Sequence, residues 1–133
     1  KDKYLSFPMG SPEYAKELIL EIEQVLGVNS NKDLYTSWEK DGWYYNANKN
    51  ESGSILYRKN KQYHTCPIYK QSMIFTSGML RWFYNNKAHN ICGPFQIFGL
   101  ERHYCINDKR LSEEEYWKHP LVLEHKLNKI LEV

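Results

Sequence analysis

The chain of 133 residues and 16.0 kDa has the length of one domain, and its apolar runs are far too short for a membrane-spanning helix. A hydrophobic content of 41% and a charged content of 26% are those of a folded globular protein, so they argue against disorder. The net charge of +2 is by itself too small to indicate a nucleic-acid-binding surface.

The first predicted element is an amphipathic helix over residues 11–27. Ser11 is placed to cap its N-terminus, Pro12 occupies the first helical position, and Gly27 is placed to end the helix. The helix carries one apolar stripe, formed by Tyr14, Ala15, Leu18, Ile19, Ile22, Val25 and Leu26. We expect this stripe to pack on the core, with a groove of a partner protein as the alternative.

Residues 38–111 predict an antiparallel sheet, which begins within a polar stretch of loop and short strand over residues 29–53. Short runs of aromatic and β-branched residues alternate there with residues that favour turns. Asn and Gly accept the positive φ that tight hairpin turns need. The expected hairpin tips are Asn60-Lys61, Ser77-Gly78, Asn85-Asn86, Gly99 and Asn107-Asp108.

Residues 112–131 are predicted to be helical again. Ser112 and Glu115 have the spacing of a capping box, in which each side chain bonds the backbone amide of the other residue. Pro120 closes this first helix, and a second helix continues to the end of the segment. Its apolar stripe consists of Leu123, Leu127, Ile130 and Leu131. We expect the two helices to form a cap over an exposed end of the sheet.

A short pattern recurs within the predicted sheet. An aromatic residue followed three positions later by Asn occurs in four pairs, Trp43–Asn46, Tyr57–Asn60, Trp82–Asn85 and Tyr104–Asn107. Glycines precede the last three pairs by four or five residues. The pattern indicates a unit of glycine turn, strand with an inward aromatic side chain, asparagine turn and return strand. Chance recurrence in a chain rich in Asn and aromatic residues is the alternative.

The segment from Trp82 to Ile97, WFYNNKAHNICGPFQI, resembles a short repeat of phage and giant-virus proteins. That repeat runs W-x-x-N-G-K-x-H-R-x-x-G-P-A-x-I and is loosely similar to MORN-type repeats. The unit from Tyr104 to Glu115 resembles the terminal unit that such proteins carry before a short helix. The resemblance covers residues 78–120 and implies a β-repeat scaffold and a viral origin, but no defined activity.

The segment departs from the repeat pattern at three positions. Asn86 replaces the turn glycine, Asn90 replaces an arginine, and Phe95 replaces an alanine. Asn can still occupy the turn, so we expect the hairpin to survive. The missing arginine weakens the case for a shared binding role at that position.

Together these elements predict an α+β fold in a single domain spanning residues 1–133. Its sheet is expected to be an antiparallel meander of hairpin repeats, with an N-terminal amphipathic helix and a C-terminal helical cap. If Trp82 and Tyr104 are equivalent inward aromatics, both should be buried and should lie on neighbouring strands.

Three pairs of residues are the candidate metal ligands: His64 and Cys66, His89 and Cys92, and His103 and Cys105. Residues two apart in a strand share a face, so the first and last pairs could each offer two ligands to zinc. The Cys-x-x-Cys spacing common in zinc sites is absent, and we expect His89 to bond a backbone carbonyl or a neighbouring turn. We therefore predict structural roles for all six residues, no metal, no cofactor, and folding that needs neither.

No nucleophile, carboxylate pair or phosphate-binding loop has the context of a known catalytic site, so we predict no enzyme and no catalytic residues. A Cys-based or metal-dependent enzyme is the alternative. The odd count of three cysteines excludes a complete disulfide framework and favours a reducing compartment. Lys1-Asp2-Lys3 is followed by no apolar segment, so we expect no secretory signal and a cytoplasmic location, in a host cell if the protein is viral.

These features predict a protein-binding module, a phage or viral accessory protein that engages a host or viral protein, with inhibition of host defence as one version. Alternation along a strand places Phe83 opposite Trp82 and beside Arg81, with Tyr69 nearby. Clusters of aromatic residues and Arg are enriched in binding hot spots, so Tyr69, Arg81 and Phe83 are the predicted partner-binding residues. The alternative for Phe83 is that the C-terminal helices cover it.

The alternative function is the binding of single-stranded nucleic acid. Basic and aromatic residues are neighbours at Tyr57-Arg58-Lys59 and at Arg81-Trp82, a combination that suits stacked bases and a phosphate backbone. A half-buried sheet with aromatic side chains facing the core and charged side chains facing water produces the same alternation without any ligand. We expect no membrane partner.

Overall fold

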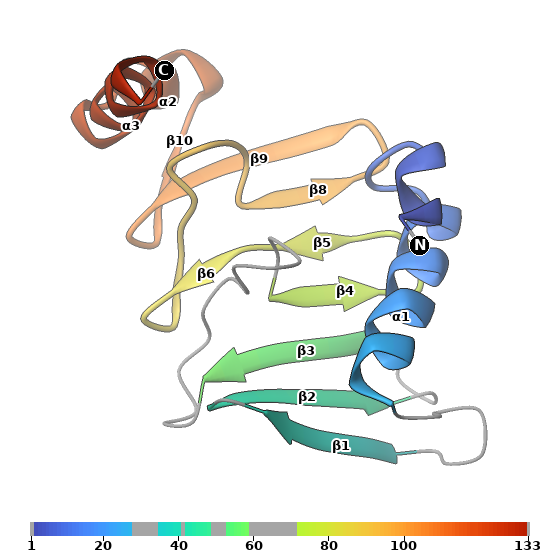
Figure 1. Ribbon diagram of the computed structural model, residues 1–133. Helices are drawn as coiled ribbons and strands as arrows, with labels where there is room; N and C mark the ends of the chain where they lie inside the picture. The colour runs from blue at the N-terminus through green and yellow to red at the C-terminus, as the bar shows by residue number, and fades with distance from the viewer. Residues whose placement is uncertain (1, 28–34, 41, 49–52, 59–71, 133) are drawn as a thin grey trace.

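The computed structural model describes residues 2–27, 35–40, 42–48, 53–58 and 72–132 (Figure 1). The helices are η1 (Lys3–Ser6), a 3-10 helix, and α1 (Pro12–Leu26), α2 (Glu113–Trp117) and α3 (Pro120–Leu131). The strands are β1 (Tyr35–Lys40), β2 (Trp43–Asn48), β3 (Gly53–Arg58), β4 (Met73–Phe75), β5 (Leu80–Arg81), β6 (Phe83–Tyr84), β7 (Lys87–Ala88), β8 (Gln96–Phe98), β9 (Glu101–Ile106) and β10 (Lys109–Leu111). Helices combined with antiparallel strands confirm the predicted α+β class.

Within the described residues, eight strands form one sheet in the order β1-β2-β3-β4-β5-β8-β9-β10, and every neighbouring pair is antiparallel. The order follows the chain except between β5 and β8, where β6 and β7 pair with each other as a separate hairpin. Figure 1 shows the strands side by side from β1 to β9, with α1 crossing one end of the sheet.

Helix α1 begins and ends as the sequence predicts. The Ser11 hydroxyl accepts a hydrogen bond from the Tyr14 amide at 3.2 Å, and Gly27 ends the helix with a left-handed φ of +73°. The buried residues of its apolar stripe are Tyr14, Ala15, Leu18 and Ile22, which share a core with Tyr45, Ala47, Ile74, Leu80, Trp82 and Ile97 of the sheet region. Val25 was predicted to belong to the packed stripe, but it is exposed, whereas Ile19 and Leu26 pack against the core as partly buried side chains.

The predicted hairpin tips in the described region are confirmed. Asn85 and Asn86 have φ of +50° and +63°, and Asn107 and Asp108 have φ of +48° and +67°. Both pairs therefore form two-residue turns in which each residue is left-handed, the geometry of tight hairpins. Ser77-Gly78 turns the chain between β4 and β5, and Gly99 does so between β8 and β9. Asn60-Lys61 lies outside the described residues.

The hairpins β6–β7 and β9–β10 are built alike and lie next to each other. Phe83 pairs with Ala88 in the first hairpin, and Cys105 pairs with Arg110 in the second, so each pair stands two positions from its turn. The two hairpins are joined through Ala88 and Asp108. The Asp108 amide donates to the Ala88 carbonyl at 2.9 Å, and the Ala88 amide donates to the Asp108 carboxylate at 2.6 Å.

Trp82 and Tyr104 are both buried, with exposed fractions of 7% and 8%, as predicted. The expectation that they lie on neighbouring strands is wrong. The chain leaves the main sheet directly after Trp82 to form the β6–β7 hairpin, so β8 lies between β5 and β9. Trp82 belongs to the core under α1, whereas Tyr104 belongs to a second core closed by α2.

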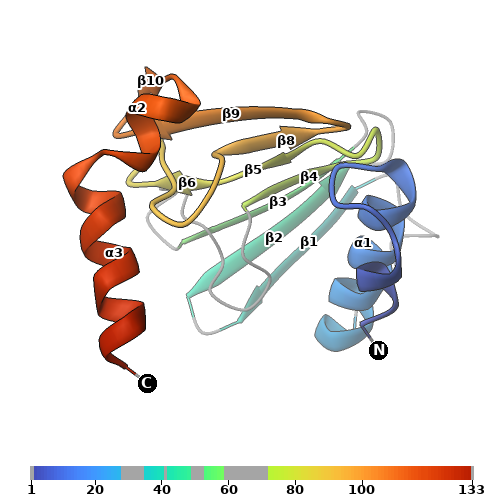
Figure 2. The same cartoon turned by 90° about the horizontal axis from the view of Figure 1, so that it is seen from above.

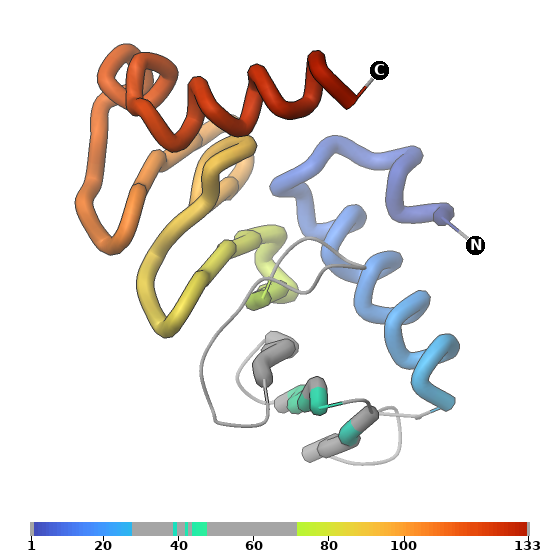
Figure 3. Tube along the Cα trace, turned by 60° about the vertical axis from the view of Figure 1, so that its left-hand side comes forward, coloured from blue at the N-terminus to red at the C-terminus, as the bar shows by residue number. Residues whose placement is uncertain are grey.

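The helical prediction for residues 112–131 is confirmed, including the capping box between Ser112 and Glu115. Tyr116 of α2 is fully buried against β9 and β10, and its hydroxyl donates to the Asn90 carbonyl at 2.6 Å and accepts from the Gly93 amide at 2.9 Å. Helix α3 then projects away from the sheet, on the same side as α1 (Figures 2 and 3). Only Val122 of α3 is buried, so α2 and the first turn of α3 form the cap, and the predicted apolar stripe of α3 does not cover the sheet.

Candidate functional site

The largest group of exposed apolar side chains on one described element lies on α3. We call Leu123, Leu127, Ile130 and Leu131 the α3 stripe; their exposed fractions are 50%, 55%, 70% and 73%. Their separations of three and four residues place them along one side of the helix. A stripe of this kind normally faces a core, and here it faces solvent.

The side of α3 next to the stripe explains how the helix is held. Val122 is buried in the second core, and Lys126, one turn later on the same side, places its Nζ atom 4.4 Å from the centre of the Trp117 ring. At the start of the helix, the Leu121 amide donates to Nδ1 of His119 at 3.2 Å. These contacts leave every residue of the stripe at least half exposed in the part of the chain that the structure describes.

Two of the three predicted partner-binding residues lie in the described part of the chain, on the consecutive strands β5 and β6. Arg81 lies on β5, where its Nε donates to the Gln96 side chain at 2.8 Å and its guanidinium lies 5.4 Å from the centre of the Phe75 ring. Phe83 is half-buried on β6, in the separate hairpin. Tyr69 lies outside the described residues.

His89 has the local structural role that was expected of it. Its Nδ1 accepts a hydrogen bond at 3.0 Å from the amide of Asn107, in the turn of the adjacent hairpin. Burial lowers the pKa of His89, and the nearby His119 lowers it further. Both imidazoles accept through Nδ1, so both contacts require that nitrogen to carry no proton.

The other candidate metal ligands are dispersed. Cys92 is exposed and contacts the Asn90 side chain at 3.1 Å, whereas Cys105 is buried and its thiol has a pKa raised by that burial. Nδ1 of His103 contacts the Arg110 guanidinium. Among the residues that the structure describes, no three His, Cys, Asp or Glu side chains gather as metal ligands would. His64 and Cys66 lie outside that part of the chain.

The stability of the protein is expected to fall as the pH drops below the ordinary histidine pKa of 6.5, because His89 has a lower pKa when folded. Below that pH the unfolded chain binds a proton that the folded chain does not, so the contribution of His89 is complete above pH 6.5 and is lost as the pH falls through its folded pKa. Urea unfolding at about pH 7.5 and about pH 5.5 measures the effect, within the range where histidine titrates.

The His89→Gln variant is the critical comparison, since glutamine offers an acceptor that does not titrate. It should lose less stability between the two pH values than the unchanged protein does. His125→Gln, on α3, is the matched control, and it should lose as much stability between the two pH values as the unchanged protein does. Equal losses in the unchanged protein and in His89→Gln would contradict this role.

Comparisons with known proteins add no further assignment. No protein-family model, no curated protein and no solved structure matches this chain. Within the described residues, the structure contains no helix with the length and apolar character needed to cross a membrane.

Proposed function

We propose that this protein is a non-enzymatic protein-binding module and that it binds its partner through the α3 stripe. The observation that carries the proposal is the exposure of four large aliphatic side chains on one side of a helix that projects from the sheet. Full burial of a Leu or Ile side chain is worth roughly 1.5–3 kcal/mol, so covering the stripe provides a substantial driving force for association. Contiguous exposed apolar surface is typical of interaction sites.

The spacing of the α3 stripe favours one mode of binding. Leu123, Leu127 and Ile130 follow the i, i+4, i+7 pattern of helices that lie in an apolar groove of another protein. The partner is therefore a protein that offers such a groove. Contacts at the first two turns hold the helix on α2, so the stripe is presented in one orientation before binding.

The scaffold is proposed to be a stack of hairpin repeats of the kind found in phage and giant-virus proteins. The matching turns and pairing of β6–β7 and β9–β10 support this interpretation, as does the resemblance around Trp82. A phage or viral accessory protein that engages a host or viral protein, for example to inhibit host defence, fits such a scaffold. A cytoplasmic location in the host cell follows from that role.

The double variant Leu127→Ser, Ile130→Ser tests the proposal. Both residues are exposed, so the variant should keep its melting temperature, because exposed substitutions usually change stability by no more than about 0.5 kcal/mol. The unchanged protein should retain a partner in an affinity experiment from infected cells, and it should bind that partner again when both are purified. The double variant should lose this binding. Arg81→Ala, Phe83→Ala is the comparison at the surface predicted from sequence, and it should keep the partner.

Two results would count against this assignment. Equal binding of one purified partner by the unchanged protein and by the α3 variant would move the site away from α3, and loss of binding in the Arg81, Phe83 variant would return it to the surface predicted from sequence. Tight binding of a labelled oligothymidine without any protein partner would favour the single-stranded nucleic-acid function instead.

A further inference from the structure

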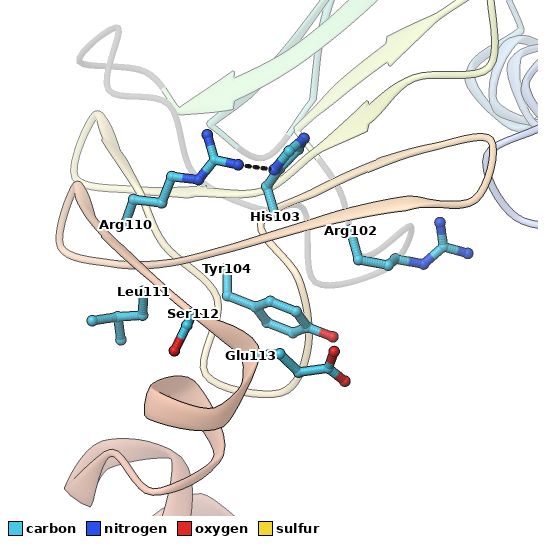
Figure 4. A pocket seen from close by; sticks show the side chains of 7 residues that line it. All are labelled: Arg102, His103, Tyr104, Arg110, Leu111, Ser112 and Glu113. Atoms are coloured by element: carbon cyan, nitrogen blue, oxygen red, sulfur yellow. Dashed lines mark hydrogen bonds between the residues drawn. The ribbon is translucent and has the colours of Figure 1, made fainter.

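A recessed surface lies at the outer edge of β9, and no residue of the α3 stripe lines it. It is a pocket of about 440 Å³ between β9, β10 and the start of α2, within the size range of small-ligand sites (Figure 4). We call it the β9 pocket. Its lining includes Arg102, His103, Tyr104, Arg110, Ser112 and Glu113.

The pocket exists because β10 is shorter than β9. Leu111 pairs with Tyr104, and the chain then leaves the sheet at Ser112 to enter α2. The first three residues of β9, Glu101–His103, pair only with β8, so in the described chain their other edge has no neighbouring strand. The departure of the chain into α2 therefore opens a recess beside this edge.

The Tyr104 hydroxyl is the unusual group in the pocket. Tyr104 is only 8% exposed, and its hydroxyl makes no hydrogen bond to any residue that the structure describes. Figure 4 shows it directed into the recess, near Glu113. A buried hydroxyl without a partner is costly, so this group is available to a ligand.

The ring of Tyr104 is held in place from the other side. The ring of Tyr116 lies 4.6 Å away and that of Trp117 lies 5.9 Å away, centre to centre. Burial raises the pKa of Tyr104, with Glu113 raising it further and Arg102 opposing this, so the phenol keeps its proton at neutral pH. The fixed hydroxyl therefore serves as a donor.

Arg102 supplies a cation on the same face of β9 as this donor. Arg102 and Tyr104 stand two apart on β9 and share a face of the strand. The Nη1 atom of Arg102 donates to the carbonyls of Gly99 and Glu101, each at 2.8 Å, which fixes the guanidinium. Its Nη2 and Nε atoms make no hydrogen bond within the described chain, so they can bind an anion.

The remaining charges define the ligand more closely. Arg110 contacts His103 on the opposite face of the strands from Arg102 and Tyr104 (Figure 4), and Glu113 is the one carboxylate among the described residues that line the pocket. The Arg102 guanidinium and the Tyr104 hydroxyl favour a ligand with an oxyanion. Glu113 favours a hydrogen-bond donor, such as an ammonium group, on the same ligand and disfavours extended polyanions.

We propose that the β9 pocket binds a small zwitterionic ligand, whose carboxylate or phosphate group accepts from Arg102 and Tyr104 and whose ammonium group meets Glu113. This site is independent of the α3 stripe, because no residue of that stripe lines it.

Titrations followed by NMR test the proposal with three probes: O-phosphoserine, glutamate and inorganic phosphate. O-phosphoserine or glutamate should shift the Arg102 Nε–H signal saturably. The probe that binds with the higher affinity identifies the preferred oxyanion. Tyr104→Phe keeps the packed ring and should weaken that binding about tenfold, the equivalent of about 1.4 kcal/mol. Tyr84→Phe, at an exposed tyrosine outside the pocket, is the matched control and should leave the affinity unchanged.

Glu113→Gln separates the roles of the two charges. This variant should bind the zwitterionic probes more weakly and inorganic phosphate more tightly than the unchanged protein does. The absence of a saturable shift with all three probes at millimolar concentration would overturn the proposal, as would equal affinity in Tyr104→Phe. Leu127→Ser, Ile130→Ser should bind the probes like the unchanged protein, so a failure here is separable from a failure of the protein-binding function.

Discussion

Replacement of Gly78 by alanine is expected to lower the free energy of unfolding by about 3 kcal/mol or more. Gly78 has a φ of +105°, and a Cβ atom there would stand 2.7 Å from the carbonyl carbon of Ser11 and closer still to the carbonyl oxygen of Gly10. Backbone strain and overpacking each cost about 1–3 kcal/mol, and here they add. The Gly10 carbonyl also accepts from the Gly99 amide at 3.0 Å, so the start of α1 cannot shift without disturbing a second turn.

Gly27→Ala is the matched control for that substitution. Gly27 is also left-handed, with φ of +73°, but among the described residues outside its own helix no atom lies within 4 Å of an added Cβ. Gly27→Ala should therefore lower the free energy of unfolding only through backbone strain, by about 1–2 kcal/mol. Chemical denaturation of both variants measures the difference, and equal losses would show that contact between the β4–β5 turn and α1 is not the cause.

Replacement of Trp82 by alanine is expected to cost about 3–5 kcal/mol, the range for truncation of a buried Trp or Phe. The side chain is 7% exposed in the core under α1, and the Trp82 amide donates to the Phe95 carbonyl at 2.8 Å. The lost volume lies where the main sheet gives way to the β6–β7 hairpin, so neighbouring groups are tied and cannot close the cavity.

Tyr84→Ala is the comparison for Trp82→Ala. Tyr84 lies two residues later and is 53% exposed, so its loss should cost much less. Urea unfolding measures both. A loss of unfolding free energy below about 1 kcal/mol for Trp82→Ala would show that Trp82 is not a core residue, since even modest truncations of buried side chains cost that much.

Features that depend on neighbours in the sequence were predicted well. The caps of α1 and α2 and the left-handed turns at Asn85-Asn86 and Asn107-Asp108 follow from side-chain chemistry over three or four residues. The backbone conformation there is chosen locally, because a hydroxyl or carboxylate reaches only the nearest amides and a left-handed φ favours Gly, Asn and Asp in any fold. The hydrogen bond from the Asn107 amide to His89 joins one such turn to the residue that follows β7, and a bond of this kind was expected from the sequence.

The candidate sites were predicted only in part. The α3 stripe was identified as an apolar face, but it was assigned to the cap, because periodicity shows that a face is apolar and not whether another element covers it. Arg102 and Glu113 carried no signal, since a single charged residue near a turn is ordinary. Tyr104 was predicted to be buried, and nothing in the sequence indicated that its hydroxyl opens into a pocket.

The tertiary structure alone decided how the aromatic residues divide between cores. Sequence spacing makes Trp82 and Tyr104 equivalent, yet the chain leaves the main sheet after Trp82, and α2 closes a second core around Tyr104. Pairing between strands and the direction of α3 depend on contacts between segments distant in the sequence. Local propensities are the same for either arrangement, and only the packing of the whole chain distinguishes them.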